Sequence, residues 1–212
     1  MEIAILLFDR LTALDALGPY EVLSRVPGNR VRLVAKQPGL VRTDNASPLG
    51  LMADEPISAV ERPDVLVVPG GPGELQARQD PDVVDWVRAV HQHTRWTTSV
   101  CTGSLILGAA GILEGLRATG HWAWLEPLRQ FGAEPTHQRV VRQGKVITAA
   151  GVSSGIDMAL ELLQLEYGDA MAQAIQLAIE YDPQPPLDAG SPEKAPPEVV
   201  ETVRKAISKL TH

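Results

Sequence analysis

The chain contains a single cysteine, Cys101, within the stretch "SVCTGSLILGAAGIL" at residues 99–113. A short apolar run ends at this cysteine, and Thr102 and Gly103 lead into a segment whose apolar residues have helical spacing. A cysteine at a strand-to-helix turn of this kind occupies the position of a nucleophile elbow. The amides that begin the following helix would stabilise a thiolate and lower the thiol pKa. We interpret Cys101 as a candidate nucleophile; the alternative is a small, buried and unreactive residue.

A nucleophilic thiol needs a proton acceptor, and the histidines of this chain are poorly placed for that role. Thr102 rather than a histidine follows the cysteine, and neither His121 nor His137 is followed by a carboxylate two positions later. This argues against a conventional cysteine–histidine pair. Asp15, in the segment "LTALDALGPYEVL" after the first apolar run, is the candidate carboxyl group, with a solvated turn residue as the alternative. Glu21 in the same segment is interpreted as a helix cap, with a site residue as the alternative.

A glycine-rich segment, "VPGGPGEL" at residues 68–75, follows another apolar run. Its consecutive glycines, Gly70 and Gly71, would expose backbone amides that can hold an anion or a developing oxyanion. It matches neither the GxGxxG nor the GK[ST] phosphate-binding pattern. We expect no metal site, because His91 and His93 stand two positions apart and so point to different sides of a helix.

Composition places the chain among ordinary globular proteins. Its 212 residues, 44% hydrophobic and 21% charged, are predicted to form one domain over residues 1–212. The net charge of -7 argues against a nucleic-acid partner, which would require a basic surface. No segment approaches the roughly 20 apolar residues of a membrane span, and the N-terminal apolar run is too short for a signal peptide. The single cysteine cannot form an internal disulfide, so a cytoplasmic location is expected.

Short apolar runs alternate with helical patterns along the chain, which predicts an α/β sandwich with a mostly parallel central sheet and helices on both faces. Continuous rather than alternating hydrophobicity is typical of parallel strands buried on both sides. Ligands of such sheets bind at the carboxyl ends of the strands, so Asp15, the glycines and Cys101 are expected on one rim. The predicted strands are 2–8, 31–35, 64–70 and 97–101; the helices between them fall within 18–26, 81–93 and 103–113; hairpins are expected at 41–54 and 139–151.

The C-terminal third has a different composition. One long amphipathic helix is predicted to run from Ser153 until Asp182 and Pro183 stop it. A proline-rich arm, 182–197, follows, and a last helix is predicted at 198–210. The arm could lie on its own domain or be exchanged with a partner subunit.

Six motifs, spread in order over nearly the whole chain, together resemble one family. They are "LDALGPYEVL", "VLVVPGGPG", "VCTGSLILGAAGIL", "ATGHWAW", "ITAAGVSSGIDMALELL" and "YDPQPPLDAGSPEKA". The chain resembles the PfpI/ThiJ superfamily of class I glutamine amidotransferase-like proteins, and within it the isocyanide hydratase group. Many members have histidine after the cysteine; Thr102 departs from that pattern, which argues against peptidase activity.

The resemblance implies a flavodoxin-like homodimer in which the Cys101 nucleophile is hydrogen-bonded to Asp15. It also implies that Thr102 is a site residue and that Gly71 is a backbone donor of the glycine loop. The implied reaction adds water to an isocyanide through a covalent cysteine thioimidate, without metal or cofactor. Two alternatives stay open: a redox-sensing or stress-response protein with an oxidisable cysteine, and a glyoxalase-like enzyme acting on 2-oxoaldehydes. A further alternative, the ligand-binding half of a transcription regulator, is disfavoured because no helix-turn-helix segment is expected from the sequence. Trp122 and Trp124 could wall an apolar pocket or pack in the core.

Overall fold

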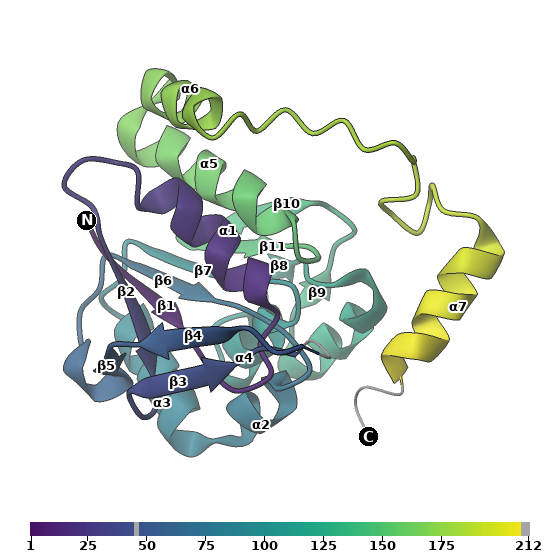
Figure 1. Cartoon of the computed structure of the whole chain (residues 1–212). Helices are drawn as coiled ribbons and strands as arrows, with labels where there is room; N and C mark the ends of the chain where they lie inside the picture. Colours follow the sequence, from purple (N-terminus) through teal and green to yellow (C-terminus); the bar gives the residue numbers. More distant parts are fainter. Residues whose placement is uncertain (45–46, 209–212) are drawn as a thin grey trace.

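A computed structural model describes residues 1–44 and 47–208 of the chain (Figure 1). Its centre is a seven-stranded sheet in the order β10–β11–β7–β6–β1–β2–β5. All neighbouring strands in it are parallel except β10 and β11, which form an antiparallel hairpin. The strands are β1 (Glu2–Leu6), β2 (Arg30–Ala35), β5 (Glu55–Pro56), β6 (Val65–Val68), β7 (Trp96–Val100), β10 (Val140–Gln143) and β11 (Val146–Ala149). The predicted flavodoxin-like architecture is confirmed.

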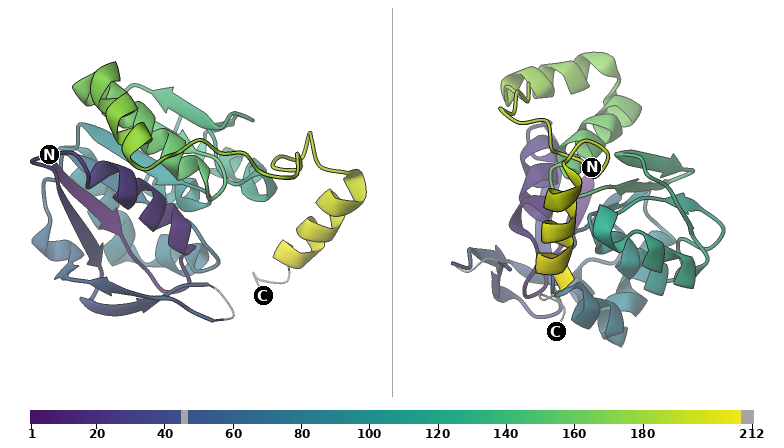
Figure 2. Two further views of the ribbon diagram at one scale, coloured as in Figure 1. Left: turned by 45° about the horizontal axis from the view of Figure 1, so that its top comes forward. Right: turned by 90° about the vertical axis from the view of Figure 1, so that its right-hand side faces the viewer.

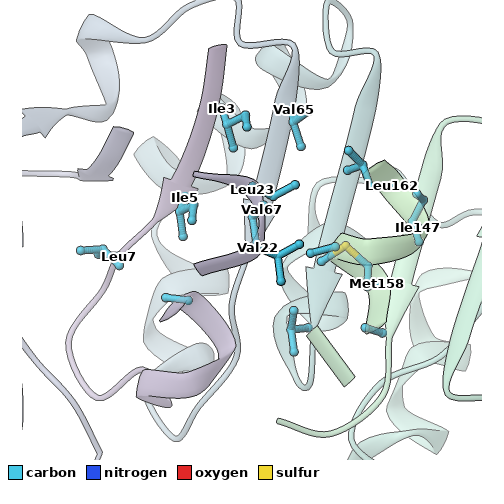
Figure 3. Close-up of a cluster of buried hydrophobic side chains, with 14 of the residues drawn as sticks. Ile3, Ile5, Leu7, Val22, Leu23, Val65, Val67, Ile147, Met158 and Leu162 are labelled. Atoms are coloured by element: carbon cyan, nitrogen blue, oxygen red, sulfur yellow. The ribbon is translucent and has the colours of Figure 1, made fainter. Parts of the chain in front are cut away.

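Successive residues of the central strands enter two different hydrophobic cores. In β1, Ile3 and Ile5 face one core, whereas Ala4 and Leu6 face the other. This alternation explains the continuous apolar runs, because side chains on both faces of the sheet are buried. Figure 3 shows the first core, where side chains of β1 and β6 meet those of the helices that cover this face.

The helices form two layers around the sheet. One layer contains α1 (Ala13–Leu23), α5 (Ser154–Tyr167) and α6 (Asp169–Ala178); the other contains α2 (Glu74–Gln79), α3 (Pro81–His91) and α4 (Gly103–Ala109) (Figure 1). Short 3-10 helices occur at η1 (Ile57–Ala59), η2 (Trp122–Trp124) and η3 (Glu126–Phe131). Two small two-stranded sheets pair β3 (Gly39–Arg42) with β4 (Gly50–Ala53) and β8 (Arg117–Ala118) with β9 (Glu134–Pro135). The hairpin predicted at 41–54 is confirmed by β3 and β4, although residues 45–46 lie outside the described residues, and the hairpin predicted at 139–151 is confirmed by β10 and β11.

Two predicted helices are corrected by the structure. The first helix was expected to begin at Gly18 and Pro19, but α1 begins at Ala13 and contains both residues. Asp15 therefore lies in the first turn of α1 rather than in the loop before it. The single helix predicted from Ser153 is two helices, because Gly168 between them adopts φ 80°, a left-handed conformation that interrupts the helix.

The C-terminal arm runs from the end of α6 to α7 (Pro197–Ser208) without helix or strand over residues 181–196 (Figure 2). This matches the predicted arm, while the end of the predicted last helix falls outside the described residues. Among the helices of the described residues, none combines the length and apolarity needed to cross a bilayer.

The sheet order decides where chemistry can take place. Strands β7, β6 and β1 are neighbours and run parallel, so their carboxyl ends meet at one edge of the sheet. Cys101 follows β7, Gly70 follows β6, and Asp15 lies soon after β1. The crossover connections of the fold thus bring together residues that are far apart in the sequence.

Candidate active site

Cys101 sits at a strained turn between β7 and α4. Its φ is 60°, a left-handed conformation that non-glycine residues adopt at an energetic cost and that recurs at functional sites. Its amide donates to the carbonyl of Ala150 at 2.8 Å, which ties the turn to the chain after β11. The residue is 5% exposed. The predicted elbow geometry is confirmed.

Gly103, the first residue of α4, allows this turn to pack against the end of β6. A Cβ atom at this position would lie 2.7 Å from the carbonyl oxygen of Pro69 and closer still to that of Val68. Both neighbours are backbone atoms, so they cannot move aside without shifting the strand.

We expect Gly103→Ala to destabilise the protein by about 1–3 kcal/mol, because overpacking at a rigid position forces backbone shifts. Denaturant unfolding of the variant would measure the loss. Gly190→Ala is a suitable control, because nothing surrounds a Cβ atom at that position within 4 Å. Equal stability of the two variants would contradict the close approach described here.

The surroundings of the thiol correct one expectation from the sequence. The backbone amides of Thr102 and Val152 hydrogen-bond to the sulfur and lower the pKa of Cys101, as a helix N-terminus should. Burial of the thiol and the nearby Asp15 carboxyl act in the opposite direction and outweigh them, so the pKa of the Cys101 thiol is raised rather than lowered. Desolvation disfavours a charged sulfur more strongly than two amide dipoles favour it.

Asp15 is completely buried beside Cys101. Its Oδ2 accepts a hydrogen bond from the amide of Gly70 at 2.9 Å, while Oδ1 has no well-directed hydrogen bond within the described part of the chain. Burial raises the pKa of Asp15 to about 7, against smaller lowering effects of the Gly70 amide and the Cys101 thiol. The prediction that Asp15 and Cys101 meet on one rim is confirmed, and the interpretation of Asp15 as a solvated turn residue is wrong.

The two acidic groups are coupled. The Asp15 carboxyl raises the pKa of the Cys101 thiol, since two negative charges in a poorly solvated site would repel, whereas the hydrogen bond from the thiol lowers the pKa of Asp15. Removing both protons at neutral pH is therefore disfavoured, and the pair retains one. A pair that holds one mobile proton can deliver it to a substrate atom while the sulfur forms a bond.

The glycine loop uses its amides to hold the site residues. The Gly70 amide is occupied by Asp15, and the Gly71 amide donates to the Thr102 hydroxyl oxygen at 2.9 Å. The sequence placed both amides as donors to substrate oxygen. In this structure they instead fix the carboxyl group and the threonine side chain that flank the thiol.

A cavity of about 660 Å³ opens onto the sulfur. Cys101, Thr102 and Gly71 line it, as expected from the sequence. Trp124 also lines it, whereas Trp122 lines an adjoining cavity of about 430 Å³. The remaining wall is formed by Thr12, Asp44, Pro72, Glu74, Leu75, Arg78, Leu105, His121, Pro127, Gln130, Val152 and Ile207.

Sequence reasoning missed several of these residues. Asp44, whose Oδ2 accepts a hydrogen bond from Thr12 at 2.8 Å, contributes to the raised pKa of Asp15 through its charge. Val152 supplies the second amide at the sulfur. Asp44 stands in none of the six motifs, and Val152, although it lies within "ITAAGVSSGIDMALELL", contributes a backbone amide that its residue type does not reveal. Glu21 lies near the end of α1, pairs with Arg25 at the surface, and is neither a cap nor a site residue.

Fold and site together define a cysteine-elbow protein of the flavodoxin-like type with an acidic partner on the first helix. The DJ-1/PfpI family matches residues 1–165, and the chain belongs to that family. The chain is 44% identical to the isonitrile hydratase of Pseudomonas putida over 205 residues, 97% of this chain and 89% of the relative.

Two further comparisons bear on fold and function. A crystal structure of a ThiJ/PfpI family protein from Pseudomonas syringae superposes with a TM-score of 0.95 at 36% identity, covering 99% of this chain and 87% of the other. The glutathione-independent glyoxalase DJR-1.2 of Caenorhabditis elegans is 25% identical over 101 residues, about half of each chain (48% and 54%). The isonitrile hydratase likeness thus extends over roughly twice as much of this chain as the glyoxalase likeness.

Proposed function

We propose that this protein is an isonitrile hydratase, which adds water to an isonitrile (isocyanide) and yields an N-substituted formamide. The observation that carries the proposal is the 44% identity to an isonitrile hydratase over 97% of the chain. The buried pair of Cys101 and Asp15 at the end of a cavity supports it, because the reaction needs a nucleophile and a proton donor at one carbon.

In the first step, the Cys101 sulfur attacks the terminal isonitrile carbon while the proton held by the pair passes from Asp15 to that carbon. A C–S bond and a C–H bond form, one component of the C≡N bond breaks, and the nitrogen retains its substituent. The product is a covalent thioimidate, with Asp15 ionised. The raised pKa of Asp15, about 7, supports this role because it keeps the carboxyl protonated up to neutral pH.

In the second step, water adds across the C=N bond of the thioimidate. The ionised Asp15 takes a proton from the water as its oxygen bonds to the carbon, and passes that proton to the nitrogen. The tetrahedral intermediate then collapses: the C–S bond breaks, the hydroxyl proton returns to Asp15, and the formamide leaves. The thiolate and the protonated carboxyl are regenerated, and the net change is the addition of one water.

Hydration of a panel of alkyl and aryl isonitriles, followed as formamide by mass spectrometry, tests the proposal. We expect turnover without added metal or cofactor. 2-Oxoaldehydes form the comparison substrates, because a glyoxalase is among the relatives. Consumption of methylglyoxal without any isonitrile hydration would contradict the proposal and favour the glyoxalase-like alternative. The homodimer and the cytoplasmic location stay predictions.

Thr102 is proposed to position the reacting groups. Its hydroxyl accepts the Gly71 amide, and its own amide contacts the sulfur. We expect Thr102→Val to lower kcat by about 10- to 100-fold, because the freed Gly71 amide loses a buried partner and the elbow shifts. Thr102→Ser retains the hydroxyl and should keep kcat within about threefold. Steady-state kinetics of both variants would measure this, and equal losses would contradict a role for the hydroxyl.

A further inference from the structure

The last described helix stands apart from the two helical layers and still reaches the Cys101 cavity. Helix α7 is joined to α6 by the extended C-terminal arm and lies beside the domain (Figure 2). Most of its side chains are exposed, Val199 among them at 43%. Ile207, near the C-terminal end of the helix, is half-buried and lines the cavity that contains Cys101.

A stack of side chains connects α7 to the same cavity at a second point. The Arg204 Cζ atom lies 5.5 Å from the centre of the Trp122 ring, within the range of a cation–π interaction. The Trp122 ring is stacked on His121, with ring centres 5.7 Å apart, and His121 lines the Cys101 cavity. Arg204 and Ile207 are three positions apart and so share one face of α7. That face of the helix is therefore directed toward the site.

Ile207 adds to the apolar residues of the cavity wall, because Leu75, Leu105 and Trp124 line the same cavity. The buried Cys101 marks the inner end of this cavity, whereas α7 lies outside the domain. The carbon of an isonitrile must approach the sulfur, so the substituent on its nitrogen extends outward, toward Ile207. Apolar contact there would contribute to binding without touching the reacting atoms.

We propose that α7 completes the substrate cavity, with Ile207 as a specificity-determining residue that contacts the distal apolar part of the isonitrile. Arg204 is a positioning residue, which holds Ile207 in place through Trp122. This inference rests on the proposed hydratase function for the identity of the reacting group. It predicts a preference for isonitriles with extended apolar substituents, and it gives the C-terminal arm the role of carrying α7 from α6 to the site.

The test compares a long and a short substrate, hexyl isonitrile and methyl isonitrile. In Ile207→Asn an apolar contact is replaced by an amide that prefers water, so kcat/KM for hexyl isonitrile should fall by at least about fivefold. For methyl isonitrile, which does not reach α7, kcat/KM should stay within about twofold of the wild-type value. Val199→Asn is the matched control: it places the same amide on α7 at a residue that lines neither the Cys101 cavity nor the adjoining one, and should leave both substrates unaffected.

Substitution of Arg204 separates positioning from a general loss of stability. Arg204→Ala removes the cation–π contact, so KM for hexyl isonitrile should rise about two- to fivefold at unchanged kcat. Arg204→Lys keeps a cation over the Trp122 ring and should restore most of the wild-type KM. A merely structural role would show neither this split between KM and kcat nor the rescue by lysine.

Unchanged kcat/KM of Ile207→Asn toward hexyl isonitrile would overturn the inference, as would an equal loss toward methyl isonitrile or in Val199→Asn. If neither isonitrile is turned over, the hydratase proposal fails, and calorimetry with N-hexylformamide decides the inference alone. Binding weakened at least about fivefold by Ile207→Asn but not by Val199→Asn would support it. Equal binding by the wild type and both variants, or no binding to the wild type, would overturn it.

Discussion

Cys101→Ala is expected to abolish isonitrile hydration, lowering kcat/KM by at least about 10⁴-fold, the scale on which loss of a covalent nucleophile acts. The variant removes the sulfur that forms the proposed thioimidate, and the Asp15 carboxylate is a far weaker nucleophile than a thiolate. The fold should persist, because the replaced side chain is small and the strained turn is held by the backbone contact to Ala150.

A second variant, Cys101→Ser, tests whether activity requires the sulfur as a nucleophile. A serine hydroxyl fits the same space but is a far weaker nucleophile than sulfur without a general base matched to it. We expect a loss of activity close to that of the alanine variant. Full activity in the serine variant would contradict the covalent scheme and leave Asp15 as a base that activates water directly.

Intact-mass measurement gives a second readout of the same prediction. Acid quenching during turnover should trap wild-type protein carrying the mass of one isonitrile, and the adduct should map to Cys101. Neither variant should show it. A protein that makes formamide rapidly without any detectable adduct, even when the isonitrile is in large excess, would speak against the thioimidate.

Asp15→Asn is expected to inactivate the enzyme and to stabilise the folded protein. The raised pKa means that the folded state holds a proton on Asp15 that the unfolded state releases at lower pH. Folding stability is therefore lost as the pH rises from the unfolded value of 3.8 to about 7, and stays lost above it. A shift of this size corresponds to roughly 4 kcal/mol. Asparagine does not titrate, and its carbonyl can still accept from Gly70.

Urea unfolding at pH 4 and at pH 8 measures this effect. Relative to the wild type, the Asp15→Asn variant should gain unfolding free energy between the two pH values, by up to about 4 kcal/mol. Glu21→Gln, at an exposed carboxylate, is the matched control and should show no comparable gain. A difference between Asp15→Asn and wild type that does not change with pH would contradict the burial-raised pKa.

The activity of the Asp15→Asn variant tests whether Asp15 supplies the proton in the proposed reaction. Without Asp15 the isonitrile carbon has no adjacent acid and the thioimidate has no base, so kcat should fall by about 10²- to 10⁴-fold. Gain of stability together with loss of activity would show that the buried carboxyl is retained for chemistry at the expense of folding. A stabilised variant with unchanged turnover would remove Asp15 from the mechanism.

Most of the fold followed from the sequence, because strands buried on both faces must be apolar without interruption. The runs at 2–8, 31–35, 64–70 and 97–101 each contain a strand of the parallel sheet. Helix boundaries were less predictable: packing on α5 keeps Pro19 inside α1, and Gly168 divides a continuous amphipathic pattern. Such outcomes depend on tertiary contacts and on one backbone angle.

The candidate nucleophile and its acid were also predictable, since a lone cysteine at a strand end and an aspartate after the first strand must share one rim of this sheet. The ionisation of the thiol was predicted in the wrong direction. A helix N-terminus is visible in a sequence, whereas the depth of burial and the nearness of a second acid exist only after folding.

By itself the sequence determined the order of strands and helices, the elbow at Cys101 and the edge at which Asp15 would meet it, because local hydrophobic spacing and parallel-strand topology fix all three. Only the tertiary structure decided that burial raises the pKa of both Asp15 and Cys101, that Gly70 and Gly71 hold side chains, and that Glu74 and Arg78 line the cavity. Each of these depends on desolvation and on hydrogen-bond partners that are distant in the chain. Neither desolvation nor distant hydrogen-bond partners can be read from the residue types alone.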